Sequence, residues 1–258
     1  MKNLSQTPNR IHLLDELRGL AVFCMVFYHA FYICGTFFGA DWADALFDFF
    51  LPVQPFFAGI FIFLCGISCT LSRSNFKRGA ILLGVALGMT LVTAVIMPKM
   101  GFVDCEIYFG ILHFLSVSIL LYAFLDKPLG RVSPFAGVLL CAVLYAFTSG
   151  IEKGTLSYGE LFSITLPDEL YESDILMPLG IYSPNFYSAD YFPLFPDIFI
   201  FASGVFAGIY CSKCGYPEQF YRQRAAFFGS LGRNALVIYV AHMPVIYALA
   251  YIIDLIIY

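Results

Sequence analysis

Residues 19–39 read GLAVFCMVFYHAFYICGTFFG, an apolar run long enough to cross a membrane, with one titratable residue, His29, inside it. At about 1.5 Å of rise per residue, His29 lies roughly 16 Å beyond Arg18, near the middle of a hydrocarbon layer about 30 Å thick. Ionisable residues at that depth face a protein interior or a wet cavity and are candidates for function. The alternative is that His29 only forms a hydrogen bond to a neighbouring helix.

Arg18 and His29 fall on the same side of the predicted helix. Eleven residues at about 100° each return to nearly the starting direction, so Arg18, Met25 and His29 share one stripe. A guanidinium at the inner mouth and an imidazole halfway along this stripe suit a ligand that enters from one side and reacts at the centre.

The composition assigns the whole chain to the membrane class. Of its 258 residues, 60% are hydrophobic and 12% are charged, whereas soluble domains carry about 25% charged residues. This length leaves room for one membrane domain, residues 1–258, and no separate soluble domain. The net charge of −4 gives no indication of nucleic-acid binding. The first apolar run lacks a small-residue cleavage site, so we expect a retained span and not a signal peptide.

Further apolar runs predict an all-α polytopic membrane bundle of about seven transmembrane helices. The predicted spans are residues 18–39, 46–71, 79–97, 107–125, 134–150, 191–211 and 235–258. With a cytoplasmic N-terminus, twelve of the fourteen Lys and Arg residues lie on the inner side, which satisfies the positive-inside rule. The C-terminus and the long connection at residues 151–190 are then extracytoplasmic. We expect a multi-pass protein of the cell membrane, either a plasma or an inner membrane.

Two more histidines lie at a similar predicted depth. His113 is about 20 Å from the inner end of the fourth span, and His242 is about 14 Å above Arg233 on the seventh. An imidazole takes a proton from a hydroxyl, amine or thiol, or carries an acyl group briefly. A three-histidine metal site is the competing interpretation, but no H-x-x-H or H-x-x-x-H spacing supports it, and we expect no metal.

Arginines gather at the predicted inner ends of the spans, among them Arg18, Arg73 and Arg233. The forked guanidinium suits phosphate groups, so we expect a phosphorylated cofactor such as coenzyme A to dock there. The alternative is that these residues only set topology and contact lipid headgroups.

The predicted outer side is acidic and aromatic. Carboxylates next to aromatic platforms suit a sugar, especially an amino sugar, although a solvated loop with packing aromatics has the same composition. Asp190 precedes the proline-rich entry to the sixth span. Pro52 and Pro55 interrupt the second span, so we expect a kink or a partly re-entrant opening there, with Asp48 near the outer face.

Five stretches together resemble one known family, the heparan-alpha-glucosaminide N-acetyltransferase catalytic-domain family, within a wider group of transmembrane acyltransferases. They span nearly the whole chain in the expected order. The stretches are RIHLLDELRGLAV from Arg10 with Tyr28-His29-Ala30, FIFLCGIS from Phe61, FGILHF from Phe109, DYFPLFP from Asp190, and LGRNAL from Leu231 with Tyr239 and His242.

The resemblance implies a multi-pass enzyme that takes an acyl group, typically acetyl, from cytosolic acyl-CoA and delivers it across the membrane to a sugar acceptor. It also implies a catalytic histidine in the first span, for which His29 is the candidate. We assign His113 to orienting His29 or stabilising charge, Arg18, Arg73, Arg233 and Asn234 to acetyl-CoA, and Asp48, Asp190 and His242 to the carbohydrate acceptor.

Two other classes of membrane protein remain open from the sequence. A proton-coupled transporter also uses midplane histidines and proline-broken spans, but no internal repeat is evident. A structural or partner-binding membrane protein leaves the histidines unexplained. Three G-x-x-x-G pairs, beginning at Gly35, Gly84 and Gly204, indicate tight helix packing within the bundle, with a homodimer as the alternative.

Overall fold

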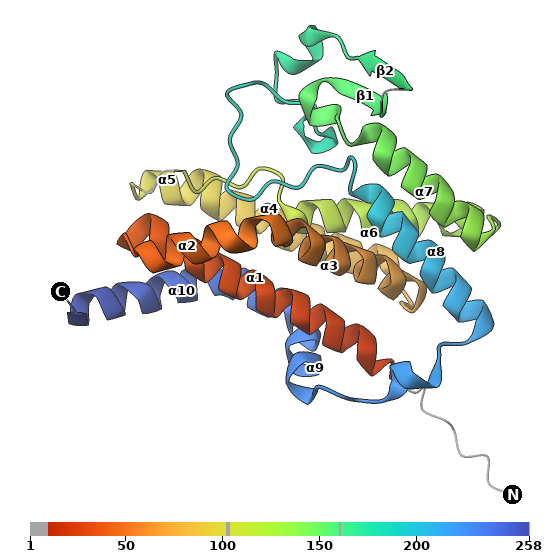
Figure 1. Cartoon of the computed structure of the whole chain (residues 1–258), viewed down its shortest axis with the longest axis horizontal. Coiled ribbons are helices and arrows are strands. Elements are labelled where there is room, and N and C mark those ends of the chain that lie inside the picture. The colour runs from red at the N-terminus through yellow and green to blue at the C-terminus, as the bar shows by residue number, and fades with distance from the viewer. Residues whose placement is uncertain (1–9, 102–103, 160, 258) are drawn as a thin grey trace, which may run out of the picture. The chain divides into compact units, whose positions relative to one another are not determined.

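The computed structural model describes residues 10–101, 104–159 and 161–257 (Figure 1). The chain is 73% helical, which confirms the predicted all-α class. The α-helices are α1 His12–Phe38, α2 Asp41–Phe50, α3 Gln54–Thr70, α4 Asn75–Thr90, α5 Met97–Lys99, α6 Ile111–Leu129, α7 Pro134–Thr148, α8 Ile198–Cys214, α9 Ala226–Arg233 and α10 Ala235–Ile257.

Six segments of the described chain are long and apolar enough to cross a membrane, so the protein is a multi-pass membrane protein. They correspond to α1, α2 with α3, α4 with α5, α6, α7 and α10. The helix of the sixth predicted span, α8, is apolar but has only 17 residues. Only 6% of the α10 window is buried, as expected for a helix that faces lipid. The direction of the termini stays a prediction.

Several predicted boundaries were wrong for local reasons. The predicted span 191–211 begins as a helix only at Ile198, because Pro193 and Pro196 interrupt regular hydrogen bonding before it. The second span begins at Asp41 and bends through a 3₁₀ turn, η1 Leu51–Val53, that contains Pro52. A π-helical turn, η2 Leu91–Ile96, joins α4 to α5.

The connection at residues 151–190 is mostly irregular and contains a short hairpin that the sequence did not predict. Strands β1 Thr155–Tyr158 and β2 Phe162–Thr165 pair antiparallel, with Thr155 opposite Thr165 and Tyr158 opposite Phe162. Short 3₁₀ turns at Ile151–Lys153, Asp168–Tyr171 and Met177–Leu179 complete this segment.

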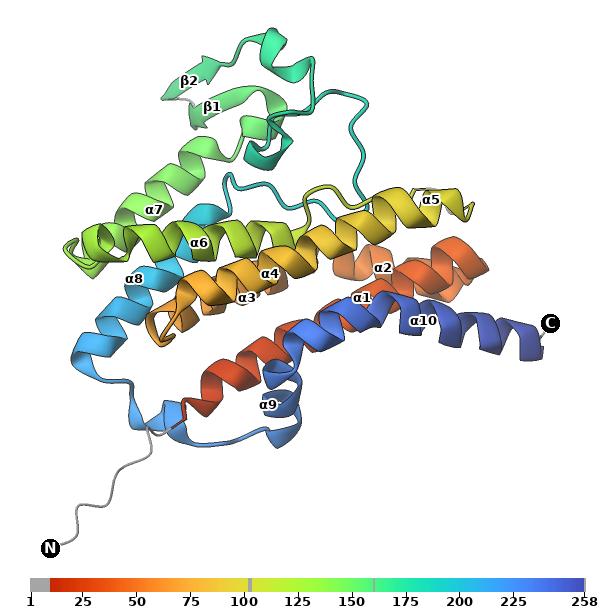
Figure 2. The same cartoon turned by 180° about the vertical axis from the view of Figure 1, so that it is seen from behind.

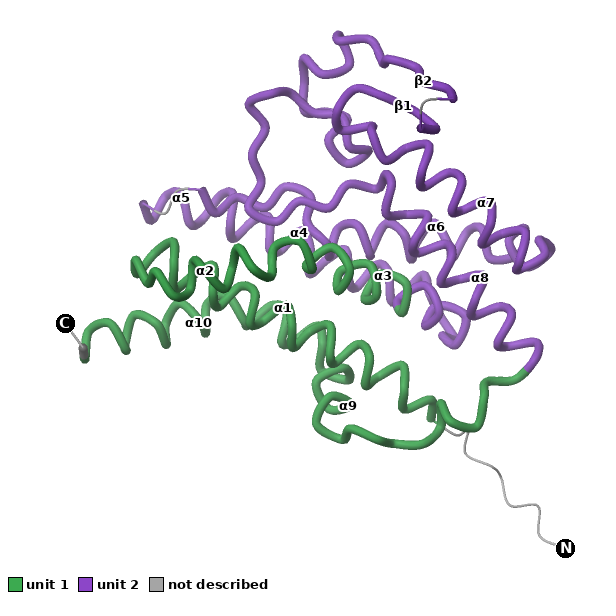
Figure 3. The backbone as a smooth tube through the Cα atoms, in the orientation of Figure 1, with its two compact units in different colours: residues 1–64, 215–258 green, residues 65–214 purple. Residues whose placement is uncertain are grey.

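Two compact units divide the chain, with the boundary inside α3 (Figure 3). The first unit comprises residues 1–64 and 215–258. In it α1 packs against α2, α9 and α10. α1 ends where Gly39 adopts a left-handed conformation, with φ of 62°, and Ala40 donates to the carbonyl oxygen of Cys34 at 3.2 Å. This C-cap turns the chain directly into α2.

The second unit comprises residues 65–214. Within it α4 lies beside α6, and α7 lies beside α8, as the view from behind also shows (Figure 2). Its core contains Phe114, Ile119 and Val205, all fully buried. Alanine at Gly84 or Gly88 would meet no heavy atom within 4 Å, so this G-x-x-x-G face of α4 is unoccupied by described residues. A homodimer through it stays a prediction.

Candidate active site

His29 lies near the middle of α1 and points its ring at the same helix's own backbone. Its Nδ1 is 3.0 Å from the carbonyl oxygen of Met25, one turn earlier. Aromatic side chains line this level of the first unit: the ring centroid of Tyr28 is 5.5 Å from that of His29 and 4.8 Å from that of Phe47 on α2. The imidazole is therefore held in a largely apolar layer.

His242 occupies the corresponding level of α10 and is 7% exposed. Its Nδ1 is 2.5 Å from the carbonyl oxygen of Tyr239. Pro244 follows two residues later inside the helix. Because proline has no N–H, it cannot donate the helical hydrogen bond to the carbonyl oxygen of Val240, one turn earlier beside this histidine.

The two imidazoles meet. His242 Nε2 lies 3.2 Å from His29 Nδ1, and the ring centroids are 4.9 Å apart. Of the three histidines that the sequence placed at one depth, these two belong to the first unit and are in contact. A pair of imidazoles at this distance can pass a proton from one ring to the other, and an unprotonated ring nitrogen can act as a general base.

The backbones of α1 and α9 approach each other closely at two glycines of the same unit. The Cβ of an alanine at Gly19 of α1 would lie 1.8 Å from the carbonyl oxygen of Phe228 on α9. The Cβ of an alanine at Gly232 would lie 1.9 Å from the carbonyl oxygen of Asp15. His29 follows Gly19 by ten residues, and His242 follows Gly232 by ten residues. This close approach of Gly19 and Gly232, the glycine crossing, holds α9 against α1, and α10 starts directly after α9 and packs on α1, where His242 contacts His29.

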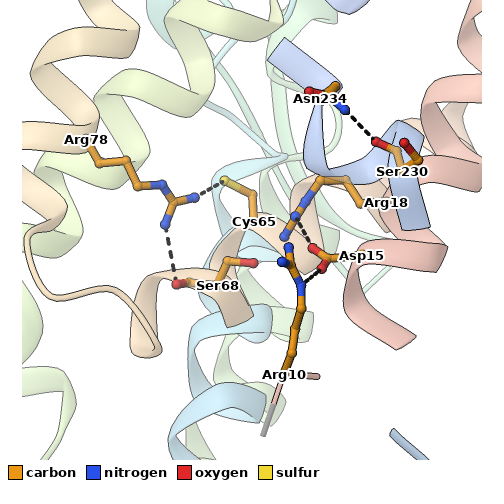
Figure 4. Close-up of polar contacts among 8 residues, drawn as sticks. All are labelled: Arg10, Asp15, Arg18, Cys65, Ser68, Arg78, Ser230 and Asn234. Carbon is orange, nitrogen blue, oxygen red and sulfur yellow. Dashed lines mark hydrogen bonds and ion pairs between the residues drawn. The ribbon is translucent and has the colours of Figure 1, made fainter. Parts of the chain in front are cut away.

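The first turns of α1 carry an ion-pair cluster (Figure 4). Asp15 lies between two arginines, with Arg10 Nε 2.7 Å from one carboxylate oxygen and Arg18 Nη1 3.1 Å from the other. The Arg18 side chain is 20% exposed. Asp15 therefore partly neutralises the charge of Arg18.

Glu16, which the sequence analysis did not single out, ties α1 to the segment before α9. It is 6% exposed, and its Oε1 accepts from the backbone N–H groups of Arg224 and Ala225 at 2.7 and 2.9 Å. A second carboxylate directly after Asp15, at the edge of the first apolar run, was the available signal. This carboxylate orders the turn that leads into the glycine crossing.

Arg233 and Asn234 end α9 in the same unit and are both exposed. Asn234 Nδ2 donates to the carbonyl oxygen of Ser230 at 2.9 Å, which caps the helix (Figure 4). Arg233 forms no ion pair with any residue in the described part of the chain. It is the more available of the two cations that the sequence assigned to the cofactor in this unit.

Arg73 belongs to the second unit, in the exposed turn between α3 and α4. Its neighbour Arg78 is half-buried instead, and donates from Nη1 to the carbonyl oxygen of Ser68 at 3.3 Å and from Nη2 to Cys65 Sγ at 3.9 Å (Figure 4). A cation at the last turn of α3 stabilises the helix C-terminus. Arg78 is thus a helix-capping residue.

His113 also lies in the second unit, 5% exposed, at the first turn of α6. Its Nδ1 accepts from the backbone N–H of Gly110 at 3.3 Å, and its Nε2 lies 3.1 Å from Thr90 Oγ1. Thr90 donates its own proton to the carbonyl oxygen of Ile107. Both ring nitrogens are therefore engaged: Nδ1 caps the first turn of α6, and Nε2 links α6 to α4.

The two acidic residues assigned to the acceptor have different surroundings. Asp190 Oδ2 accepts from the backbone N–H of Ile111 at 3.2 Å, so it caps the N-terminus of α6, where a negative charge is favourable. Asp48 lies exposed on α2 of the first unit and forms no hydrogen bond or ion pair with a described residue.

The aromatic residues of the 151–190 connection and its continuation pack largely on one another. The rings of Tyr182, Phe186 and Tyr191 lie with centroids 5.1–5.2 Å apart. Tyr182 donates to Glu152 Oε2 at 3.0 Å, and burial together with this carboxylate raises the pKa of Tyr182 to about 12. Burial and Glu152 also raise the pKa of Asp197, the residue before α8, to about 6.

No group of three His, Cys, Asp or Glu residues in the described ranges is arranged to hold a metal ion.

The family comparison bears directly on the contact between His29 and His242. The family model of the heparan-alpha-glucosaminide N-acetyltransferase catalytic domain matches the chain over residues 10–244. The chain belongs to this family. The match begins at Arg10 in the ion-pair cluster and ends two residues beyond His242, so it includes the glycine crossing and both paired histidines. Searches of curated proteins and of solved structures gave no match to the chain.

Membership of the heparan-alpha-glucosaminide N-acetyltransferase catalytic family identifies a membrane acetyltransferase and confirms the resemblance found in the sequence. The membrane-length helices agree with it.

Proposed function

We propose that the protein transfers an acetyl group from cytosolic acetyl-CoA to a hydroxyl or amine of a carbohydrate on the opposite side of the membrane, with His29 as the general base. The observation that carries this proposal is the contact between His29 and His242 in the middle of two apolar helices, inside the matched family domain. Enzymes of this family use acetyl-CoA as co-substrate.

The chemistry needs one base at the thioester carbonyl. His29 takes the proton of the acceptor N–H or O–H as the acceptor nitrogen or oxygen attacks the acetyl carbon. The C–S bond then breaks, the thiolate of coenzyme A leaves, and the imidazolium returns the proton to sulfur. The products are an acetylated acceptor and coenzyme A. In the alternative course His29 itself carries the acetyl group between two displacements.

The inner end of the first unit supplies cations for the phosphates of the donor. Arg233 is exposed and has no carboxylate partner among the described residues, while Arg18 shares Asp15 with Arg10. Arg18 is roughly 16 Å from His29 along α1, a span that the extended pantetheine arm of coenzyme A bridges. Arg73 and Asn234 remain proposed donor contacts, and Asp48 a proposed acceptor contact.

We assign His113 and Asp190 to the structure of α6, because both are hydrogen-bonded to its first turn. His113 therefore leaves the catalytic role to His29. A negative charge and an imidazole acceptor at that turn satisfy backbone N–H groups that a buried helix end otherwise leaves unpaired.

The test uses purified protein in sealed vesicles, with labelled acetyl-CoA outside and glucosamine inside. Vesicles with a mixed insertion present the cytosolic face outward in part of the population, so the proposal predicts labelled N-acetylglucosamine in the lumen and free coenzyme A outside. Acetyl-CoA binding without transfer to any amine or hydroxyl sugar contradicts the acceptor class. Uptake of unmodified glucosamine that follows a proton gradient and ignores acetyl-CoA supports the transporter instead.

A further inference from the structure

The atoms around each ring nitrogen determine which nitrogen of His29 and of His242 carries the proton. A carbonyl oxygen only accepts hydrogen bonds. His242 Nδ1 lies 2.5 Å from the Tyr239 carbonyl oxygen, so Nδ1 carries the proton and Nε2 of the neutral ring has the lone pair. His29 Nδ1 lies 3.0 Å from the Met25 carbonyl oxygen, so this nitrogen carries a proton as well.

The proton on His29 Nδ1 faces a second acceptor. His242 Nε2, with its lone pair, is 3.2 Å away, and it shares this proton with the Met25 carbonyl oxygen. The other tautomer of His29 would turn the lone pair of Nδ1 toward a carbonyl oxygen and an imidazole lone pair at the same time. The arrangement therefore holds the lone pair of His29 on Nε2, to which no described residue is hydrogen-bonded.

We infer that His242 is the positioning residue of the base: it holds the proton on His29 Nδ1 and keeps Nε2 unprotonated for the acceptor. This inference rests on the proposed function of His29. When Nε2 takes the proton of the acceptor, the positive charge on the His29 ring is shared along the bond from Nδ1 to His242 Nε2. A charge-assisted hydrogen bond of this kind is stronger than the neutral one, so His242 favours the protonated intermediate.

This role differs from the acceptor contact that the sequence assigned to His242. Both nitrogens of His242 are engaged, one by Tyr239 and one by His29, and the side chain is 7% exposed. An acceptor contact would make KM for the sugar depend on His242. A positioning role makes kcat depend on it and leaves both KM values nearly unchanged.

Two substitutions separate the loss of the hydrogen-bond acceptor atom, His242 Nε2, from the loss of the imidazole ring. His242→Leu removes this hydrogen-bond acceptor and keeps an apolar side chain in its place. His242→Gln places an amide oxygen near the former Nε2, where it accepts from His29 Nδ1 without being able to titrate.

The experiment is ¹⁵N NMR of histidine-labelled protein in nanodiscs, with kcat and KM measured on the same samples. The chain has four histidines, so single substitutions assign each ring. We expect His29 of the wild type and of His242→Gln to carry its proton on Nδ1, and His242→Leu to shift part of the population to the other tautomer, because only the Met25 carbonyl oxygen then accepts from Nδ1. We expect kcat of His242→Leu to fall about 10- to 100-fold, within the 10²- to 10⁴-fold that a general base supplies. His242→Gln should recover most of this loss.

The two readouts distinguish the failures. A proton on Nε2 of His29 in the wild type overturns the inference whatever the turnover. A raised KM for the sugar with unchanged kcat in His242→Leu also overturns it, in favour of the acceptor contact. A wild type that has the expected tautomer but transfers no acetyl group overturns the proposed function, and with it the catalytic purpose of the pair.

Discussion

Alanine at position 19 puts a methyl group where the crossing of α1 and α9 leaves no room for one. Its Cβ would lie 1.8 Å from the carbonyl oxygen of Phe228 and 2.8 Å from the backbone nitrogen of Gly232. Both neighbours are backbone atoms, so no change of rotamer relieves the overlap. Since Cβ atoms essentially never approach another heavy atom within 3.0 Å, the two segments must separate by about 1.2 Å or more.

The separation costs stability and disturbs the histidine pair. Overpacking of this kind costs about 1–3 kcal/mol, more than the roughly 0.5–1 kcal/mol that alanine gains over glycine inside a helix. If α1 moves as one body away from α9 and α10, the distance from His29 Nδ1 to His242 Nε2 grows from 3.2 Å to about 4.4 Å, beyond hydrogen-bonding range. We therefore expect Gly19→Ala to lower both the unfolding temperature and kcat.

Thermal unfolding in detergent and acetyl transfer in nanodiscs measure the two effects. Gly84→Ala is the matched control: it makes the same change inside a helix, with no heavy atom within 4 Å of the added methyl. This control should be as stable and as active as the wild type. If Gly19→Ala is also indistinguishable from the wild type in both assays, the close approach of α1 and α9 does not maintain the contact between His29 and His242.

Three further predictions concern other parts of the chain. Arg233→Gln should weaken acetyl-CoA binding about 1.4- to 5-fold by calorimetry, the 0.2–1 kcal/mol typical of exposed ion pairs, and an unchanged Kd would remove Arg233 from the donor site. His113→Leu leaves the buried N–H of Gly110 unpaired and should destabilise the protein by about 1–3 kcal/mol with kcat retained; a stable but inactive variant would return His113 to catalysis. Asp197 has a pKa raised from 3.8 to about 6 by burial and Glu152, so the folded state binds its proton more tightly. Stability should fall by about 3 kcal/mol between pH 4 and pH 6, and Asp197→Asn should flatten that part of the stability profile.

The sequence was most informative where one chain segment determines its own structure. The length and polarity of the run around His29 predict a membrane helix without any knowledge of its neighbours, and α1 spans His12–Phe38. The depth of His242 follows from counting residues in the same way. The predicted start of the sixth span at residue 191 was wrong, because hydropathy alone does not register that Pro193 and Pro196 prevent a helix there.

The partners of the candidate site residues depend on contacts between distant segments, which no local pattern encodes. Arg18 appears as a lone cation in the sequence, but Asp15 pairs with it and with Arg10. His113 has the same predicted depth as His29, yet its nitrogens serve α6 because Thr90 lies beside it. The contact between Gly19 and Gly232 joins segments more than 200 residues apart, so neither glycine could be recognised from the sequence as a packing residue.

The most direct test of the account is a single-turnover measurement of acetyl transfer from labelled acetyl-CoA to glucosamine by the wild type, His29→Ala and His12→Ala. His12 begins the same helix, and its replacement is the matched control. The account predicts that His29→Ala binds acetyl-CoA with nearly wild-type affinity and transfers the acetyl group at least 100-fold more slowly, because the general base is gone, while His12→Ala is unaffected. Transfer by His29→Ala at the wild-type rate would contradict the central claim.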